Sequence, residues 1–280
     1  MDYQTIISCE QLAQIQSDSK VVILDASIPP VGKMAKPIYS WPMTIIPGAL
    51  RFDLDRDFSD HDAKYPHTMV GDSVFQQQSR MLGIDQDSQI VVYDNLGLFS
   101  AARAWWMFKS MGHHRVAVLD GGLPAWIKAK HPTTTFEHRD IPLGNFVAKA
   151  SFDYFKSAEQ VLDLINAPDT TIVDARANNR FKGEAPEPRA GVRSGHIPSS
   201  QNVPYSSLLN DGLLKPASEL EEIWRSIASQ EQALVFSCGS GVTACVLALS
   251  ANLAGHTNLS VFDGSWSEWG TDTKYPVETN

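Results

Sequence analysis

The sequence predicts an α/β protein made of two tandem copies of one unit, each a mostly parallel sheet flanked by helices. Short apolar runs rich in β-branched residues, such as "VVIL" at 21–24 and "LVFS" at 234–237, are typical of buried parallel strands. Helical patterns lie between such runs, as in "SAARAWWMFKSM" at 100–111 and "TACVLALSANLA" at 243–254. The order of these segments also occurs twice along the chain, which indicates an internal duplication.

The first copy can be followed element by element. Ser8 and Gln11 have the spacing of a capping box, in which a serine at a helix start is followed three residues later by glutamine. The next expected elements of this copy are, in order, a strand in "VVILDAS" at 21–27, the segment "IIPGALRFDL" at 45–54, a strand in "IVVYDN" at 90–95, the helix over 100–111 and a strand in "VAVLDGGLPAW" at 116–126.

The second copy returns the same elements in the same order. Ser157 and Gln160 repeat the capping box, and 149 residues separate Ser8 from Ser157 as well as Asp25 from Asp174. The remaining counterparts are "TTIVDAR" at 170–176, "HIPSSQNVPY" at 196–205, "LVFSCG" at 234–239 and "LSVFDGSWSEW" at 259–269.

The stretch between the copies, 131–150, contains two prolines and no strong period, which is typical of a linker. We therefore expect an N-terminal domain over residues 1–132, a linker over 133–150 and a C-terminal domain over 151–280.

Composition excludes several classes of protein. The chain has 280 residues, enough for roughly two domains with sizeable cores. Its net charge of −9 argues against a nucleic acid or an anionic membrane as the main partner. The first residues, "MDYQTIISCE", make a poor signal peptide, and no apolar run has the length of a membrane span. Three cysteines are too few for a disulfide framework, so we expect a reducing cytoplasm.

The segment "SCGSGVTA" at 237–244 is the strongest sign of chemistry, because it places Cys238 on a glycine-rich loop between an expected strand and an expected helix near Thr243. Glycines allow successive backbone N–H groups to turn inward, and a helix N-terminus adds partial positive charge. Such a loop stabilises a thiolate, or a persulfide anion one sulfur longer. The first copy has Asp94 at the matching place and lacks the paired glycines, so only the second copy is expected to be catalytic.

Cys238 has two alternative interpretations. The cysteine could be a small buried hydrophobe beside a turn, although the strand–loop–helix context favours a reactive thiol. A metal site is a weaker alternative, because Cys238 and Cys245 are seven residues apart with no CxxC pair and no nearby histidine. Cys245 is expected in the core of an apolar helix, and Cys9 is expected to be structural.

With these residues in view, the chain resembles the two-domain rhodanese family of sulfurtransferases over essentially its whole length, and within it the members that use 3-mercaptopyruvate. The resemblance rests on the loop Cys238–Thr243 and on "GHIPSSQNVP", "RFKGEAPEPR", "SAARAWWMF" and "DGSWSEW". Thiosulfate-using relatives typically carry basic residues in the loop, and none is present here. The first copy has Ile45-Ile46-Pro47-Gly48 where the family usually has His-Ile-Pro-Gly.

The resemblance implies roles for particular residues. Cys238 would be the nucleophile and would carry the persulfide, with Gly239, Ser240, Gly241, Val242 and Thr243 as its cradle. Arg180 and Arg189 would bind the carboxylate of the keto acid, to which the planar guanidinium is well matched.

Asp55 and His67 match an aspartate and a histidine that are proposed to relay protons with the loop serine, Ser240. The segment around His67 is one residue longer here than in the relatives. Arg176 and Arg193 have no such support, and we expect Arg176 to pair with a nearby acid instead.

The family further implies that no metal or organic cofactor is needed, and that cyanide or thiols such as thioredoxin accept the sulfur. Three alternatives remain open from the sequence: a thiosulfate:cyanide sulfurtransferase on the same fold, a phosphatase or arsenate reductase, and a sulfur carrier that keeps a persulfide for a partner. Phosphatases generally have an arginine at the end of the loop, where this chain has Val242-Thr243-Ala244.

Trp126 and Trp269 occupy matching places in both copies, so packing is their expected role.

Overall fold

The structure is a computed structural model that describes residues 4–28, 44–135 and 139–279. These residues form two compact units. The first comprises the chain as far as Asp60, together with Met69–Ser151 and Asp211–Leu213. The second comprises His61–Thr68, Phe152–Asn210 and the chain from Leu214 onward.

The first unit is built on a five-stranded sheet in which every neighbouring pair is parallel. The strand order is β1-β6-β5-β2-β4. The strands are β1 (Ile6–Ile7), β2 (Val21–Asp25), β4 (Leu50–Arg51), β5 (Gln89–Tyr93) and β6 (Val116–Leu119).

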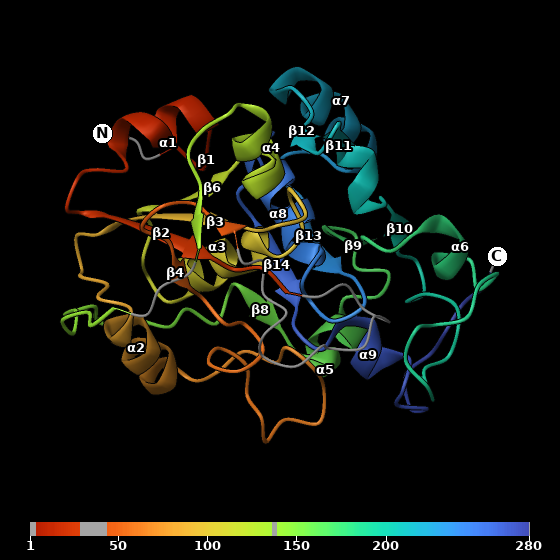
Figure 1. The fold of residues 1–280 in the computed structure, drawn as a ribbon. Coiled ribbons are helices and arrows are strands. Elements are labelled where there is room, and N and C mark those ends of the chain that lie inside the picture. The colour runs from red at the N-terminus through yellow and green to blue at the C-terminus, as the bar shows by residue number, and fades with distance from the viewer. Residues whose placement is uncertain (1–3, 29–43, 136–138, 280) are drawn as a thin grey trace. The chain divides into compact units, whose positions relative to one another are not determined.

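Helices cover both faces of this sheet, so its strands are buried on both sides. Helices α1 (Cys9–Ile15) and α4 (Gly122–Lys128) contribute Leu12 and Trp126 to one core cluster, together with Val91 of β5. On the other face, Phe75 of α2 (Asp72–Met81) makes an edge-on ring contact with Phe108 of α3 (Ala101–Ser110). Figure 1 shows α1 and α2 on opposite sides of β2.

The second unit has the same architecture. Its sheet is parallel throughout and has the order β10-β9-β13-β14-β8. The strands are β8 (Phe155–Lys156), β9 (Thr170–Asp174), β10 (Gln201–Asn202), β13 (Ala233–Ser237) and β14 (Leu259–Phe262). Because each strand takes the place of its counterpart in the first sheet, the predicted fold of two tandem α/β units is confirmed.

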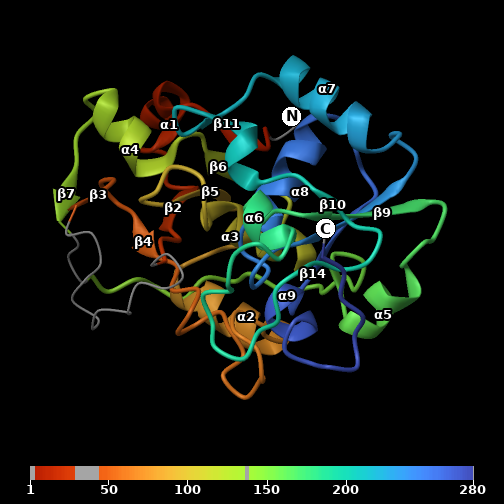
Figure 2. The same cartoon turned by 90° about the vertical axis from the view of Figure 1, so that its right-hand side faces the viewer.

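Four helices enclose the second sheet. Helices α5 (Ala158–Asp163) and α9 (Ser265–Trp269) share a core cluster with Val235 of β13. Helices α7 (Ala217–Ile227) and α8 (Ala244–Leu253) lie on the other face, where Trp224 makes an edge-on contact with Phe236. Figure 2 shows α7 and α9 on opposite sides of β14. The alternation of Val235 and Phe236 between two apolar faces explains why β13 is apolar from Ala233 to Phe236.

The remaining elements are short. Strands β3 (Thr44–Ile45) and β7 (Thr134–Thr135) pair antiparallel. The others are α6 (Asn178–Phe181), the 3₁₀ helix η2 (Tyr205–Leu208), β11 (Leu209–Asn210) and β12 (Leu213–Leu214).

The stretch expected as a linker contains residues 136–138, which lie outside the described residues. Its later part packs on the first unit, where the N–H of Gly144 donates to Arg80 and the N–H of Phe146 donates to Ile84. Phe146 is fully buried there.

The local signals at the helix starts are also confirmed. Ser8 and Ser157 each accept a hydrogen bond from the backbone of the glutamine three residues later, and each glutamine side chain accepts one in return. Thr243 is the residue that precedes the first turn of α8, as its position in the sequence predicts.

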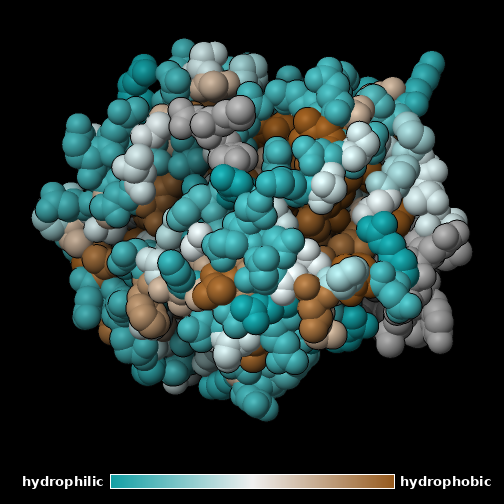
Figure 3. Space-filling model, turned by 90° about the vertical axis from the view of Figure 1, so that its left-hand side faces the viewer, coloured by the Kyte–Doolittle hydropathy of each residue, from teal (hydrophilic) through white to brown (hydrophobic). Residues whose placement is uncertain are grey.

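The described residues contain no helix long and apolar enough to cross a membrane. On the face drawn in Figure 3, hydrophilic residues predominate and brown hydrophobic residues lie mainly in recesses between them.

Candidate active site

Cys238 lies at the carboxyl end of the central strand of the second sheet. β13 ends at Ser237, and β13 runs between β9 and β14, so the next residue emerges where the neighbouring parallel strands also end. Open α/β sheets bind ligands at this edge. The backbone of Cys238 is anchored by the start of α9, since its N–H donates to Ser265 Oγ at 3.1 Å and its carbonyl accepts from the N–H of Trp266 at 3.0 Å. The residue is only 2% exposed.

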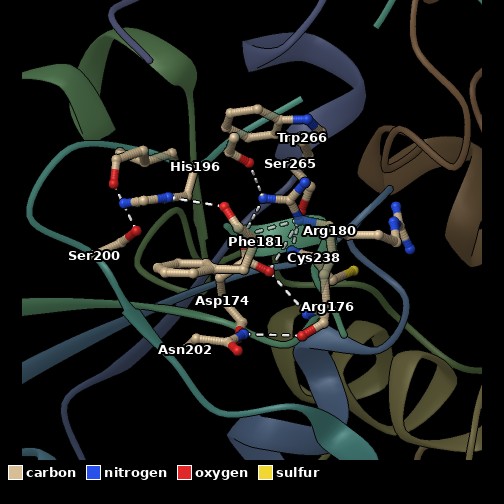
Figure 4. Close-up of polar contacts among 12 residues, drawn as sticks. Asp174, Arg176, Arg180, Phe181, His196, Ser200, Asn202, Cys238, Ser265 and Trp266 are labelled. Carbon is tan, nitrogen blue, oxygen red and sulfur yellow. Dashed lines mark hydrogen bonds and ion pairs between the residues drawn. The ribbon is translucent and has the colours of Figure 1, made fainter. Parts of the chain in front are cut away.

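Glycines shape the loop that follows. Gly241 has φ = +74°, a conformation that residues with a Cβ adopt only at a cost. A Cβ at Gly239 would lie 3.6 Å from Nη2 of Arg180 and 3.9 Å from Nη1 of Arg189. The structure therefore brings both predicted substrate-binding arginines to one side of the residue next to Cys238. Figure 4 shows Arg176, Arg180 and Cys238 gathered close to Asp174, the last residue of β9.

The first unit contains the same strand–loop–helix arrangement with an acidic side chain in place of the thiol. Asp94, the counterpart of Cys238, is fully buried. Its Oδ2 accepts hydrogen bonds from the backbone N–H groups of Phe99, Ser100 and Ala101 at 2.8–2.9 Å, and its Oδ1 accepts one from Leu96 at 2.9 Å. Burial raises the pKa of Asp94, while these N–H donors act in the opposite direction by stabilising the carboxylate.

The amides of the first loop therefore converge on one acidic group at the start of α3. Helix α3 begins at Ala101 and helix α8 begins at Ala244. When the two helix starts are aligned, Phe99 and Ser100 correspond to Val242 and Thr243. This internal counterpart supports the expectation that the loop after Cys238 can hold an anion.

Ser240 and His67 are brought together although 173 residues separate them. Nδ1 of His67 lies 2.8 Å from Oγ of Ser240, and Ser240 is buried. His67 belongs to the short segment His61–Thr68, which is part of the second unit, and it has φ = +61°. Asp55 belongs to the first unit, in an exposed turn after β4. The roles of these three residues in a proton relay stay predictions.

A buried network of charges supports the arginines. Arg176 donates to both carboxylate oxygens of Asp174, and its Nη1 donates to Oε1 of Glu187 at 2.9 Å. Arg176 also lies over the ring of Trp266, with Cζ 4.2 Å from the ring centroid. Burial alone would lower the pKa of Arg176, but the charges of Asp174 and Glu187 raise it above its ordinary value. The expectation that Arg176 pairs with an acid is confirmed, and its role is structural.

Arg193 is also structural. Its guanidinium donates to the backbone carbonyls of Trp269, Gly270, Asp272 and Tyr275, and thereby fixes the segment that follows α9.

Two features of the site could not be read from the sequence. Glu187 holds Arg180 through two hydrogen bonds, and nothing but its place in "PEPR", two residues before Arg189, pointed to it. Ser267 donates from Oγ to the carbonyl of Gly239 at 2.6 Å and accepts from Nη1 of Arg189 at 3.3 Å. The "DGSWSEW" segment therefore has a polar function besides packing, since its serines attach α9 to the loop.

The expected core residues are buried. Trp126 and Trp269 are both fully buried, and the indole N–H of each donates to a proline carbonyl, so packing is confirmed as their role. Cys245 is fully buried in α8, and its Sγ donates to the carbonyl of Gly241. Cys9 lies in the core cluster of the first unit, where burial, with the neighbouring charges of Glu10 and Asp120, raises its pKa to about 11.

Comparison with known proteins identifies the family. The Rhodanese-like domain family matches the chain twice, at residues 8–129 and 157–272. The chain belongs to the rhodanese family. Each match covers most of the sheet and the helices of one α/β unit, so the predicted pair of rhodanese-like domains is confirmed.

Several relatives of this rhodanese cover nearly its whole length. A 3-mercaptopyruvate sulfurtransferase from Mus musculus is 37% identical over 277 residues, which cover 95% of this chain and 92% of the relative. A thiosulfate sulfurtransferase from Rattus norvegicus is 38% identical, with the same coverage. The crystal structure of SseA from Escherichia coli, described as a 3-mercaptopyruvate sulfotransferase, superposes with a TM-score of 0.84 at 33% identity and covers 94% of this chain and 99% of its own.

These relatives confirm the prediction that the protein is a sulfurtransferase of the rhodanese family. Overall identity does not separate the two sulfur donors, because relatives named for each are about equally similar. Among the residues that the structure describes, no group of three or more His, Cys, Asp or Glu side chains is arranged to hold a metal ion.

Proposed function

We propose that this rhodanese is a 3-mercaptopyruvate sulfurtransferase with Cys238 as its nucleophile. The observation that carries the proposal is the pair of guanidiniums beside Gly239, because a small α-keto acid needs its carboxylate held next to the thiol. Arg180 and Arg189 would bind that carboxylate. The uncharged loop Gly239–Thr243 would cradle the sulfur anion through its backbone N–H groups.

The reaction would proceed in two steps. The Cys238 thiolate attacks the sulfur of 3-mercaptopyruvate, the carbon–sulfur bond breaks, and the pyruvate enolate leaves. The proton of the transferred S–H group passes to the enolate carbon, which yields pyruvate and the anionic Cys238 persulfide. Ser240 and His67 would relay this proton, which their hydrogen bond at 2.8 Å supports, with Asp55 as a further candidate.

In the second step an acceptor attacks the outer sulfur, the sulfur–sulfur bond breaks, and the Cys238 thiolate is restored. Cyanide would leave as thiocyanate, and a thiol such as that of thioredoxin would leave as a persulfide. Substituted-enzyme kinetics follow from this order of events. No metal or organic cofactor takes part in either step.

We also propose that the protein acts in the cytoplasm. Cys9, Cys238 and Cys245 are all free thiols, which is compatible with a reducing compartment.

Mass spectrometry of the intact protein provides the test. After mixing with 3-mercaptopyruvate, the wild-type protein should gain the mass of one sulfur atom and lose it again when cyanide is added. Cys238→Ser should show neither the mass gain nor pyruvate release, whereas Cys245→Ser should retain both. Steady turnover by Cys238→Ser would refute the assignment of the nucleophile.

Thiosulfate is the second candidate donor, because the thiosulfate sulfurtransferase of Rattus norvegicus is 38% identical. The absence of a charged side chain in the loop 239–243 favours 3-mercaptopyruvate. A comparison of kcat/KM for the two donors decides between them, and faster use of thiosulfate would overturn the substrate assignment. Persulfide formation without multiple turnover would instead indicate a sulfur carrier.

A further inference from the structure

Glu187 is a buried charged group beside the candidate site that the proposed reaction leaves without a role. Its side chain is only 4% exposed, and it lies between Arg176 and Arg180. A buried carboxylate is costly unless it is paired, so its retention beside a substrate-binding arginine calls for a reason.

The contacts of Glu187 with its two arginines are unequal in importance. Arg176 is already held by both oxygens of Asp174 and by the carbonyl of Gly195. Arg180 has two hydrogen bonds to Glu187, from Nε to Oε1 at 3.1 Å and from Nη2 to Oε2 at 2.6 Å. The position of the Arg180 guanidinium therefore depends on Glu187 far more than that of Arg176 does.

This geometry determines how Arg180 can meet a substrate. A guanidinium offers two edges for paired hydrogen bonds, one formed by Nε with an Nη and one formed by the two Nη atoms. Glu187 occupies the Nε–Nη2 edge. Nη2 also approaches Gly239, so the edge formed by Nη1 and Nη2 is the one left for a ligand beside Cys238.

Glu187 also sets the charge of this region. Asp174 and Glu187 together carry two negative charges, and Arg176 and Arg180 carry two positive charges, so the four contacting side chains balance. Replacing Glu187 by glutamine would leave one positive charge in excess, in addition to that of Arg189 beside Gly239. A donor with two negative charges would gain more from that excess than a donor with one.

We propose that Glu187 is a positioning and specificity-determining residue, which fixes the Arg180 edge offered to the donor and favours donors of one negative charge over donors of two. The inference rests on the proposed function, because 3-mercaptopyruvate carries one negative charge and thiosulfate carries two. By Coulomb's law, one charge about 7 Å away at an effective dielectric constant of about 40 changes binding by roughly five- to tenfold per unit of donor charge.

The test compares the wild type with Glu187→Gln, Glu187→Asp and the control Glu184→Gln, whose carboxylate is exposed in the same segment. For Glu187→Gln, the ratio of kcat/KM for thiosulfate to kcat/KM for 3-mercaptopyruvate should rise about five- to tenfold. Glu187→Asp keeps the charge on a shorter side chain, so kcat/KM should fall for both donors at an unchanged ratio. Glu184→Gln should change neither quantity.

Inhibition by sulfate and by pyruvate measures the same preference without sulfur transfer, since these anions carry two charges and one. An unchanged ratio in Glu187→Gln, by turnover and by inhibition, would overturn the specificity role. Unaltered kcat/KM in Glu187→Asp would overturn the positioning role, even if Glu187→Gln failed to fold. Failure of the wild type to use 3-mercaptopyruvate would instead refute the proposed function, so the two failures are distinguishable.

Discussion

Replacing Asp94 tests whether the strand–loop–helix unit of this fold binds an anion through its backbone. In the first unit the carboxylate of Asp94 accepts four backbone hydrogen bonds, three of them on Oδ2. Asp94→Asn can keep its oxygen at the Oδ2 position, but its NH₂ group then faces the N–H of Leu96. The loss of one hydrogen bond to a charged acceptor corresponds to about 2 kcal/mol of unfolding free energy.

Asp94→Ala removes the acceptor for all four N–H groups in a site that is fully buried. Unpaired buried donors cost about 1–3 kcal/mol each, and water that enters the vacated space offsets part of that cost. We therefore expect Asp94→Ala to lower the unfolding free energy of the first unit by about 4 kcal/mol or more.

Urea denaturation followed by tryptophan fluorescence measures these losses, and hydrogen exchange of the 95–101 peptide locates them. Asp18→Asn is the matched control, because the carboxylate of Asp18 accepts one hydrogen bond from the backbone N–H of Lys20 in an exposed turn. It should change stability by less than about 1 kcal/mol. If both Asp94 variants behave like Asp18→Asn, the loop amides do not form an anion site, and the parallel argument for Cys238 loses its support.

Three further predictions concern other buried or paired groups. Arg176→Met leaves the carboxylate of Asp174 buried without its partner. The unfolding free energy, measured by denaturant titration, should therefore fall by about 3–5 kcal/mol. A loss below about 1 kcal/mol would contradict the structural role of Arg176. Cys9 has a pKa raised to about 11 by burial, so iodoacetamide at neutral pH should label it only after unfolding, and rapid labelling of the native protein would disprove its burial. A hydrogen bond from Tyr275, aided by Lys274, lowers the pKa of Glu159 to about 2. The extra unfolding free energy of the wild type over Glu159→Gln should therefore be constant above about pH 4.5 and should decline towards pH 2. A difference that does not depend on pH would refute this coupling.

Much of the fold could be predicted because its signals are local. Runs such as 234–236 are apolar without interruption because both faces of their sheet are covered, so consecutive residues are buried. The capping boxes at Ser8 and Ser157 involve residues three positions apart. The duplication was visible because equivalent elements have kept equivalent patterns. The domain limits 1–132, 133–150 and 151–280 stay a prediction.

The candidate site was predicted less evenly. Cys238 was conspicuous because its loop is glycine-rich, and Arg180 and Arg189 were named through the family resemblance. Glu187 was not identified, because an acidic residue in a loop is usually solvated and only the folded backbone shows that this one is buried between two arginines. The anchoring of the loop by Ser267 was missed for a similar reason, since α9 approaches Gly239 only after the strands have paired.

The sequence by itself determined the class of fold and the twofold repetition, because both depend on patterns along the chain. Its glycine-rich loop and the family resemblance also predicted Cys238 as the nucleophile. Tertiary structure alone decided which charges balance one another and which groups meet. Nδ1 of His67 and Oγ of Ser240 lie 2.8 Å apart although 173 residues separate them. Asp94 accepts several backbone N–H groups, and no sequence pattern predicts those hydrogen bonds. Electrostatic and hydrogen-bonding partners depend on distance in space and on exclusion of water, and both arise only when the chain has folded.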